Sequence, residues 1–414
     1  MRVLLSVCLA LLVARLSEAA DLSSCVGNFR LATDHVVSVT DWEVDPSSPH
    51  VLVCTDILTG RSGVLRPASE NEWVLPAALM SGDEEARLRY TPSRGGAAAL
   101  TWLPSGKAAR PAERIPVRSR ELSFRSGSTP LHGTLWLPAG KGPFPGVAIV
   151  PAGRVGRAAA APFTHFFLSE GYAVLAYDRR AERAGFLQYA EDASAAVHAL
   201  GEQPEVHAKR VGLWGHSQGG WVALMAAARS NEIAFVIDHS GMLLPAWQQE
   251  LYRLGAEALA DSTPPETVQQ AVAFETLLMR VGASGAGWSQ VSAQLALKPP
   301  PAWHALVYQP DSLAQLRRIW REDFSFDPRP EVKNVRQPVL ALFGGLDRST
   351  PIESAAHLVH AIGSNGNLEV EFFPTADHAF LEARTGGNAE IPGLRRFVPG
   401  MFDSLRVWLR RHAR

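Results

Sequence analysis

The sequence predicts an α/β protein with a mostly parallel, doubly wound sheet, and three observations support this fold class. From about residue 117 onward, short apolar runs typical of strands alternate with longer runs typical of helices. One of these apolar runs leads into a serine between glycines, and a helical run follows at once. The 414 residues, with 46% hydrophobic and 20% charged content, are enough for two or three globular units.

The first residues have the features of a secretory signal peptide. Met1-Arg2 gives a positive start, residues 3–13 form an apolar run, and residues 17–19 are Ser-Glu-Ala. We expect cleavage after Ala19, so that residues 1–19 are removed and the mature protein is periplasmic or secreted. The apolar run is shorter than the about 20 residues that cross a bilayer, so no integral membrane segment is expected after cleavage.

Cys25 and Cys54 are the cysteines that remain after such a cleavage. An oxidising compartment favours a disulfide between them, whereas two separate buried thiols fit the same sequence. The separation of their Cα atoms would decide, and the sequence leaves both possibilities open.

Residues 21–115 are expected to form a small antiparallel β domain. Short β-prone runs alternate there with clusters of Gly, Pro, Ser and Asp. Residues 108–116, with prolines at 111 and 116, are expected to be a linker. No catalytic pattern lies in this domain, and we expect it to pack against the rest of the chain; shaping the entrance of the site or binding a partner are the alternatives.

Two segments, 117–242 and 331–414, are expected to form the catalytic α/β domain. The expected parallel strands lie at 146–150, 172–177, 210–214, 235–238, 338–343 and 368–373. The helix-rich residues 243–330 interrupt the alternation between two strands, which predicts a cap above the carboxyl edge of the sheet, where open sheets bind ligands. The cap aromatics either line an apolar pocket or form the core of the cap: Trp288, Trp303, Tyr308 and Trp320.

The residues Gly215-His216-Ser217-Gln218-Gly219 are the strongest functional signal. The order of strand, G-x-S-x-G and helix is that of a nucleophile elbow, which holds a serine hydroxyl above the sheet. Glycines on both sides of the serine are expected because a Cβ there would clash in so tight a turn. The alternative is a glycine-rich turn with a solvated serine.

A serine needs a base to accept its proton, and the base needs an orienting carboxylate. In this architecture the acid and then the histidine follow the serine in the chain. Asp347 comes just after the strand at 338–343, and His378 just after the strand at 368–373. We therefore predict Ser217, Asp347 and His378 as the catalytic residues, with Asp377 as the rival acid.

The oxyanion of such a reaction needs backbone N–H donors. We expect the N–H of Gln218, at the start of the helix, and that of Gly153, in the loop after the strand at 146–150. Arg154 is the second choice for this loop. The cluster Tyr177-Asp178-Arg179-Arg180 ends at the same sheet edge, and a salt-bridge network is its expected role.

From residue 117 to its end, the chain resembles the α/β-hydrolase superfamily, and within it the dienelactone-hydrolase-like and prolyl-oligopeptidase-like serine esterases of bacteria that carry an extra N-terminal β domain. The likeness rests on the elbow, on Leu346-Asp347, on Asp377-His378 and on residues 131–138. It implies an α/β-hydrolase fold, a Ser217–His378–Asp347 triad and ester hydrolysis without a cofactor or metal. Many members carry His-Gly before the oxyanion loop, where this chain has Pro151-Ala152.

The expected function is hydrolysis of small carboxylic esters through an acyl-enzyme. A serine peptidase or an acyltransferase would use the same triad, and a non-catalytic binding protein on a hydrolase scaffold is the alternative from another class. The formal net charge of -1 argues against nucleic acid as a partner. The acyl and alcohol specificity and the oligomeric state stay open.

Overall fold

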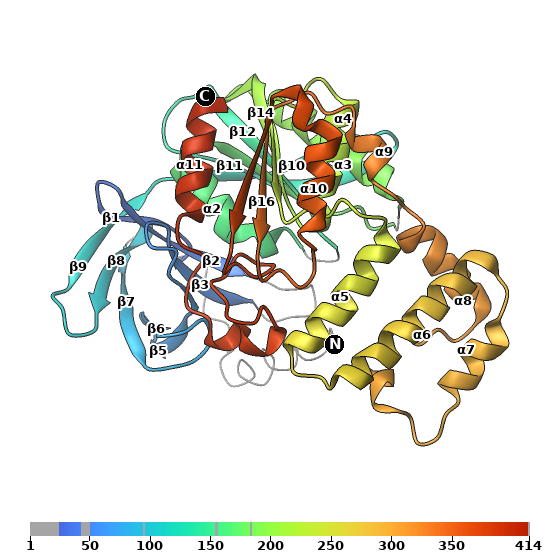
Figure 1. Ribbon diagram of the computed structural model, residues 1–414. Helices are drawn as coiled ribbons and strands as arrows, with labels where there is room; N and C mark the ends of the chain where they lie inside the picture. The colour runs from blue at the N-terminus through green and yellow to red at the C-terminus, as the bar shows by residue number, and fades with distance from the viewer. Residues whose placement is uncertain (1–24, 43–49, 94–95, 154–155, 183, 413–414) are drawn as a thin grey trace.

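The computed structural model describes residues 25–42, 50–93, 96–153, 156–182 and 184–412. The predicted signal peptide, with Cys8, lies outside this part of the chain. Within it, no helix has both the length and the apolar character needed to span a bilayer. Two sheets and a group of helices beside them make up the fold (Figure 1).

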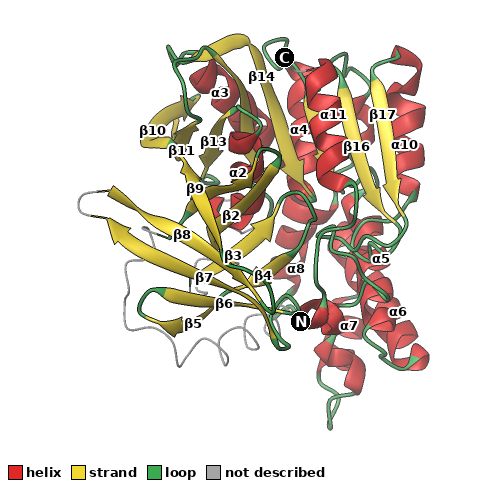
Figure 2. Cartoon of the chain, turned by 90° about the vertical axis from the view of Figure 1, so that its left-hand side faces the viewer, coloured by secondary structure: helices red, strands yellow, loops and turns green. Residues whose placement is uncertain are grey.

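The N-terminal part is a nine-stranded antiparallel sheet in the order β4-β3-β2-β1-β9-β8-β7-β6-β5. Its strands are β1 (Gly27–Ala32), β2 (His35–Trp42), β3 (Val51–Asp56), β4 (Ser62–Val64), β5 (Arg66–Ser69), β6 (Glu72–Pro76), β7 (Glu84–Ser93), β8 (Gly96–Pro104) and β9 (Arg110–Ile115). Its core contains Phe29, Leu52 and Leu88. Figure 2 shows this strongly twisted sheet beside the larger one.

The prediction of a linker at 108–116 was wrong. Residues 110–115 form strand β9, which lies between β1 and β8 in the sheet. Proline is rare inside a sheet because it lacks an N–H donor. Pro111 is accommodated because β1 pairs with residues 113–115, beyond the proline. Pro111 lies opposite Thr101 of β8 and needs no donor toward β1.

Cys25 and Cys54 are both buried in this part of the molecule, and no disulfide joins one to the other. Burial, and then the charge of Asp56, raise the pKa of the Cys54 thiol far above its usual value. The structure therefore has the second of the two arrangements that the sequence left open.

The larger sheet has eight strands in the order β10-β11-β13-β12-β14-β15-β16-β17. They are β10 (Arg118–Ser126), β11 (Thr129–Leu137), β12 (Phe144–Val150), β13 (Ala173–Tyr177), β14 (Val206–His216), β15 (Val236–His239), β16 (Val339–Gly344) and β17 (Leu368–Phe373). From β13 to β17 all neighbours are parallel, and β10 and β11 add an antiparallel edge. All parallel carboxyl ends therefore meet at one edge.

Helices cover both faces of this sheet (Figure 1). One face carries α2 (Ala161–Ser169) and α11 (Met401–His412), and the other carries α3 (Phe186–Gly201), α4 (Gln218–Arg229), α9 (Arg329–Val332) and α10 (Glu353–Ile362). Strand β12 is apolar throughout because Val147 and Ile149 pack on the first face while Ala148 and Val150 pack on the second. The predicted doubly wound α/β fold is confirmed.

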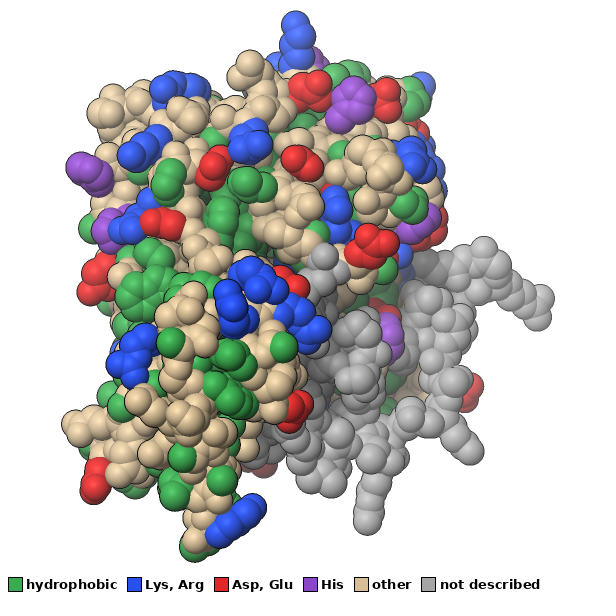
Figure 3. All heavy atoms as spheres, turned by 90° about the vertical axis from the view of Figure 1, so that its right-hand side faces the viewer, with side chains coloured by type: hydrophobic (Ala, Val, Ile, Leu, Met, Phe, Trp, Pro, Cys, Tyr) green, Lys and Arg blue, Asp and Glu red, His purple; other side chains and the backbone are tan. Residues whose placement is uncertain are grey.

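Between β15 and β16 the chain forms α5 (Ala246–Ala260), α6 (Pro265–Ser284), α7 (Trp288–Leu295) and α8 (Leu313–Ile319). These helices have their own core, in which Trp303 packs against Phe274 with ring centroids 4.6 Å apart. On the face shown in Figure 3, hydrophobic, basic and acidic side chains are interspersed where the surface is coloured by type. The division into domains at the boundaries given above stays a prediction.

Candidate active site

The serine of the predicted elbow lies between the end of β14 at His216 and the start of α4 at Gln218. Ser217 has φ 55° and ψ −123°, a conformation that costs energy for any residue with a side chain. Two backbone bonds hold it: its N–H donates to the carbonyl of His239 at 2.8 Å, and its carbonyl accepts from Gly220 at 2.9 Å. The turn between β14 and α4 is therefore tight and strained.

The glycines of the elbow are required by space. A Cβ on Gly215 would lie 2.1 Å from the carbonyl oxygen of Gly219. A Cβ on Gly219 would lie 2.6 Å from the carbonyl oxygen of Val150 at the end of β12. Glycine at both positions lets α4 start directly against the strand ends, which brings residue 217 to the sheet edge.

His378 and Asp347 meet in the turns that follow β17 and β16. His378 Nδ1 lies 3.0 Å from Asp347 Oδ1 and 2.9 Å from Oδ2. The carboxylate also accepts the backbone N–H groups of Ser349 at 2.8 Å and Thr350 at 2.7 Å. Asp347 is only 3% exposed, so these four contacts fix both its position and its charge.

The two groups shift each other's pKa. Burial opposes the charge of Asp347, but the charge and hydrogen bond of His378 and the two N–H donors outweigh it and lower the pKa. Burial likewise opposes protonation of His378, but the charge and hydrogen bond of Asp347 outweigh it and raise the pKa above 6.5. The pair therefore favours a carboxylate that stabilises an imidazolium.

Asp377, the alternative candidate for the catalytic acid, makes hydrogen bonds with backbone groups of its own turn and not with the His378 ring. Its carboxylate accepts the N–H groups of Ala379 at 2.9 Å and Leu381 at 2.8 Å, within its own turn. Burial raises its pKa to about 7, against the effect of those bonds. Its contacts are those of a turn-stabilising side chain.

His216, next to the serine, connects the elbow with the histidine turn. Its Nε2–H donates to the carbonyl of His378 at 2.7 Å, and the two rings lie 4.7 Å apart. Burial, and then the charge of His378, lower its pKa to about 4. Among the described residues, the hydrogen bonds of the His378 ring go to Asp347 and none to Ser217 Oγ. In such enzymes the bond between serine and histidine often tightens only when substrate binds.

The predicted oxyanion donors lie against each other. The N–H of Gln218 belongs to the first turn of α4, where helix N–H groups lack partners within the helix. The N–H of Gly153 donates to Oε1 of the Gln218 side chain at 2.9 Å. Arg179 also donates to this oxygen, at 2.7 Å. Arg154 lies outside the described residues.

Helix α5 holds the Asp347 turn, which sequence reasoning did not foresee. Gln249 donates to the carbonyl of Ser349 at 2.6 Å, and the Tyr252 hydroxyl donates to the carbonyl of Asp347 at 3.0 Å. The Ser349 hydroxyl donates to Glu257 at 2.7 Å. The spacing of residues 249, 252 and 257 on one helix face is the signal that could have indicated this contact.

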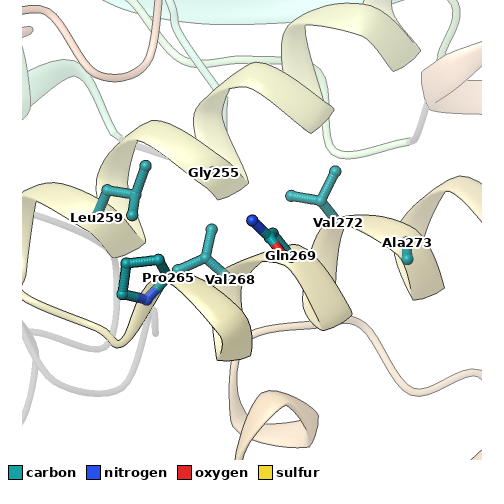
Figure 4. A pocket seen from close by; sticks show the side chains of 7 residues that line it. All are labelled: Gly255, Leu259, Pro265, Val268, Gln269, Val272 and Ala273. Atoms are coloured by element: carbon teal, nitrogen blue, oxygen red, sulfur yellow. The ribbon is translucent and has the colours of Figure 1, made fainter.

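An apolar groove of about 450 Å³ lies between α5 and α6. Figure 4 shows its lining: Gly255, Leu259, Pro265, Val268, Gln269, Val272 and Ala273. None of the predicted catalytic or oxyanion residues lines it. Of the four cap aromatics, Trp303 is a core residue, only 6% exposed.

Comparison with known proteins identifies the family to which the chain belongs. A sequence model of the alpha/beta hydrolase family matches residues 131–387. No curated protein matches the chain.

Among solved structures, similar ones cover 72% of this chain each. They include 2,6-dihydroxy-pseudo-oxynicotine hydrolase (17% identity, 68% of that chain, TM-score 0.47). An esterase from Pyrococcus furiosus follows (16%, 92%, 0.44), and so does an alpha/beta hydrolase from Penicillium sp. sh18 (20%, 99%, 0.45). The family match spans more than half of the chain and confirms the resemblance to the α/β-hydrolase superfamily that was noted in the sequence. The chain belongs to the alpha/beta hydrolase family and is an enzyme of the hydrolase type.

Proposed function

We propose that the protein is a serine esterase that hydrolyses small carboxylic esters through an acyl-enzyme. The observation that carries this proposal is the pairing of the His378 ring with the buried Asp347 carboxylate, in turns next to the strained elbow that bears Ser217. An orienting carboxylate and a raised histidine pKa are what a general base for a serine requires.

In the proposed mechanism, Ser217 Oγ attacks the ester carbonyl while His378 Nε2 takes the hydroxyl proton. Asp347 keeps the proton on His378 Nδ1 and stabilises the imidazolium that forms. The backbone N–H groups of Gln218 and Gly153 stabilise the oxyanion. His378 then gives its proton to the leaving alcohol, and a water activated by the same histidine releases the acid.

The test is Ser217→Ala. We expect kcat for a short p-nitrophenyl ester to fall by several orders of magnitude, because the nucleophile of the acyl-enzyme is lost. Labelling by a fluorophosphonate probe should be lost in the same variant. Unchanged ester hydrolysis by Ser217→Ala would refute the proposal, and cleavage of peptides alone by the wild-type protein would contradict the esterase specificity.

Secretion belongs to this proposal as well. If residues 1–19 act as a signal peptide, the mature N-terminus should begin after Ala19. N-terminal sequencing of protein from the periplasmic and extracellular fractions would check both the cleavage and the location.

A further inference from the structure

Arg179 lies beside the predicted oxyanion loop because of the sheet register. Strands β12 and β13 are parallel, and Ile149 pairs with Ala176. The chain leaves β12 toward Gly153 and leaves β13 toward Arg179, so both follow neighbouring strand ends. The start of α4 reaches the same edge, because β14 is the other neighbour of β12.

The Arg179 guanidinium bonds both residues that supply the predicted oxyanion donors. Its Nη1 donates to the carbonyl of Gly153 and, at 2.7 Å, to the side-chain oxygen of Gln218. That side-chain oxygen also accepts the N–H of Gly153, at 2.9 Å. The three groups form a closed ring of hydrogen bonds at the edge of the elbow.

The position of the cation is fixed from its other side. Its guanidinium carbon lies 3.6 Å from the centre of the Tyr189 ring, and burial is the largest cause that lowers its pKa. The adjacent arginines are used differently: Arg157 pairs with Asp178 and Glu121, and Arg180 pairs with Asp192. The hydrogen bonds of Arg179 go instead to uncharged oxygens, those of Gly153 in the predicted oxyanion loop and of the Gln218 side chain.

Hydrogen bonds, and not packing, hold the backbone conformation of Gly153. Its φ is 58°, a region that favours glycine, and a Cβ added there would meet no atom within 4 Å. Packing around the Cα therefore does not impose this conformation. The contacts that hold the residue are hydrogen bonds: its N–H donates to the side-chain oxygen of Gln218, and its carbonyl accepts from Arg179.

We propose that Arg179 is a positioning residue for the oxyanion hole. It holds the carbonyl of Gly153 and the side chain of Gln218, so that the backbone N–H groups of these two residues converge beside Ser217. The Gln218 carboxamide oxygen occupies the Gly153 N–H until the carbonyl oxygen of a substrate replaces it. This inference rests on the proposed function and adds to it the group that shapes the hole.

The main experiment compares Arg179→Met with Arg157→Met. Methionine keeps the apolar stem and removes the donors, and Arg157 is a nearby control whose bonds go to Asp178, Glu121 and Thr134. We expect Arg179→Met to lower kcat for a short p-nitrophenyl ester about 10²-fold, the effect of losing one oxyanion donor, with KM nearly unchanged. Arg157→Met should keep its kcat within a few-fold.

Chemical rescue separates positioning from folding. Adding guanidinium ion at a low, non-denaturing concentration to Arg179→Ala should restore kcat about tenfold or more, since the ion supplies the same donors. Equal concentrations of NaCl and urea should restore nothing. A full kcat in Arg179→Met, an equal loss in Arg157→Met, or the absence of rescue in a folded Arg179→Ala would overturn the inference.

A second variant applies if the arginine substitutions do not fold. Gln218→Glu keeps a partner for Arg179 and places a charged oxygen on the Gly153 N–H, which a neutral ester carbonyl displaces less easily. We expect a rise in KM and a fall in kcat throughout the pH range in which His378 is neutral and acts as a base. Kinetics identical to wild type across the pH range would contradict the proposed occupancy. A wild-type protein that neither cleaves esters nor reacts with fluorophosphonate would instead overturn the proposed function itself.

Discussion

The N-terminal sheet and the helical insertion each support one of the two turns that form the His378–Asp347 pair, but with different bonds. The sheet holds the segment after His378 mainly by backbone hydrogen bonds: the N–H of Phe397 donates to Gly60, and that of Ser62 donates to Arg395. The side chain of Arg61 adds a bond to the same Arg395 carbonyl at 2.7 Å. Phe380 in turn accepts from Val398 at 2.7 Å. Helix α5 holds the Asp347 turn through the side chains of Gln249, Tyr252 and Glu257.

Because of this difference, side-chain substitutions are expected to affect the two turns in different ways. Backbone bonds persist when side chains are replaced, so the segment after His378 is expected to loosen most when packing is removed. Side-chain bonds are lost one substitution at a time, so the acid turn can be adjusted in small steps. Four variants test this comparison, from the largest expected effect to the smallest.

The largest effect is expected at the pair that the two regions support. Asp347→Asn should lower kcat about 10⁴-fold, because an amide favours the wrong histidine tautomer. The partner that raises the pKa of His378 is lost, so the acidic limb of kcat/KM should move to lower pH. A pH series of ester hydrolysis measures both. Asp377→Asn, which keeps an acceptor for its turn, should retain most of the activity.

Phe397→Ala tests the support from the N-terminal sheet. Phe397 is 7% exposed and packs against Phe163 and Phe402, with ring centroids 5.8 and 5.2 Å apart. We expect the free energy of unfolding to fall by about 3–5 kcal/mol. Urea unfolding measures this change. Phe372→Ala, at a residue 51% exposed on β17, should cost far less, and equal losses would contradict the assigned role of Phe397.

Tyr252→Phe tests the support from α5. The variant loses the hydroxyl that donates to the carbonyl of Asp347 at 3.0 Å, a bond worth about 1 kcal/mol. We expect kcat to fall several-fold while the thermal midpoint barely moves, since the ring stays in place. Tyr308→Phe, at an exposed residue of the same insertion, should leave kcat unchanged. If stability falls and kcat does not, α5 has only a structural role.

Glu257→Gln is expected to have the smallest effect. Burial lowers the pKa of His378, the charge and hydrogen bond of Asp347 raise it, and the charge of Glu257 raises it further. Because the histidine must be neutral to act as a base, the acidic limb should move to lower pH, by less than in Asp347→Asn. Glutamine still accepts from Ser349. A limb that stays in place, as expected for the control Glu266→Gln, would show that this charge does not reach the site.

The positions of the parallel strands along the chain could be predicted from the sequence, because apolar runs such as 146–150 and 338–343 have few alternatives in an α/β chain. Strand β9 could not, since Pro111 is a strong loop signal and its acceptability depends on where β1 stops pairing. Helix α10 was not predicted either. Its sequence, residues 353–362, contains histidines and small residues whose burial becomes clear only against the sheet.

The site divides along the same line. Ser217, Asp347 and His378 could be proposed as catalytic residues because each follows a strand, and parallel strands bring their carboxyl ends to one edge of the sheet. The contacts of Arg179 and of α5 could not be predicted, because they depend on side-chain reach across elements that are distant in the sequence. Gly153 was predicted as a donor, but its bond to the Gln218 side chain requires coordinates.

Because Cys25 and Cys54 are buried, a single introduced cysteine can be used to label the helical insertion and monitor its movement in solution. Cys54 is fully buried and its pKa is raised, so it presents little thiolate to alkylating dyes, and Cys25 is buried as well. In protein cleaved after Ala19, which lacks Cys8, a cysteine introduced at the half-exposed Leu259, on the rim of the groove in Figure 4, would therefore take up a maleimide fluorophore selectively. Such a probe would report whether α5 and α6 change their spacing during turnover.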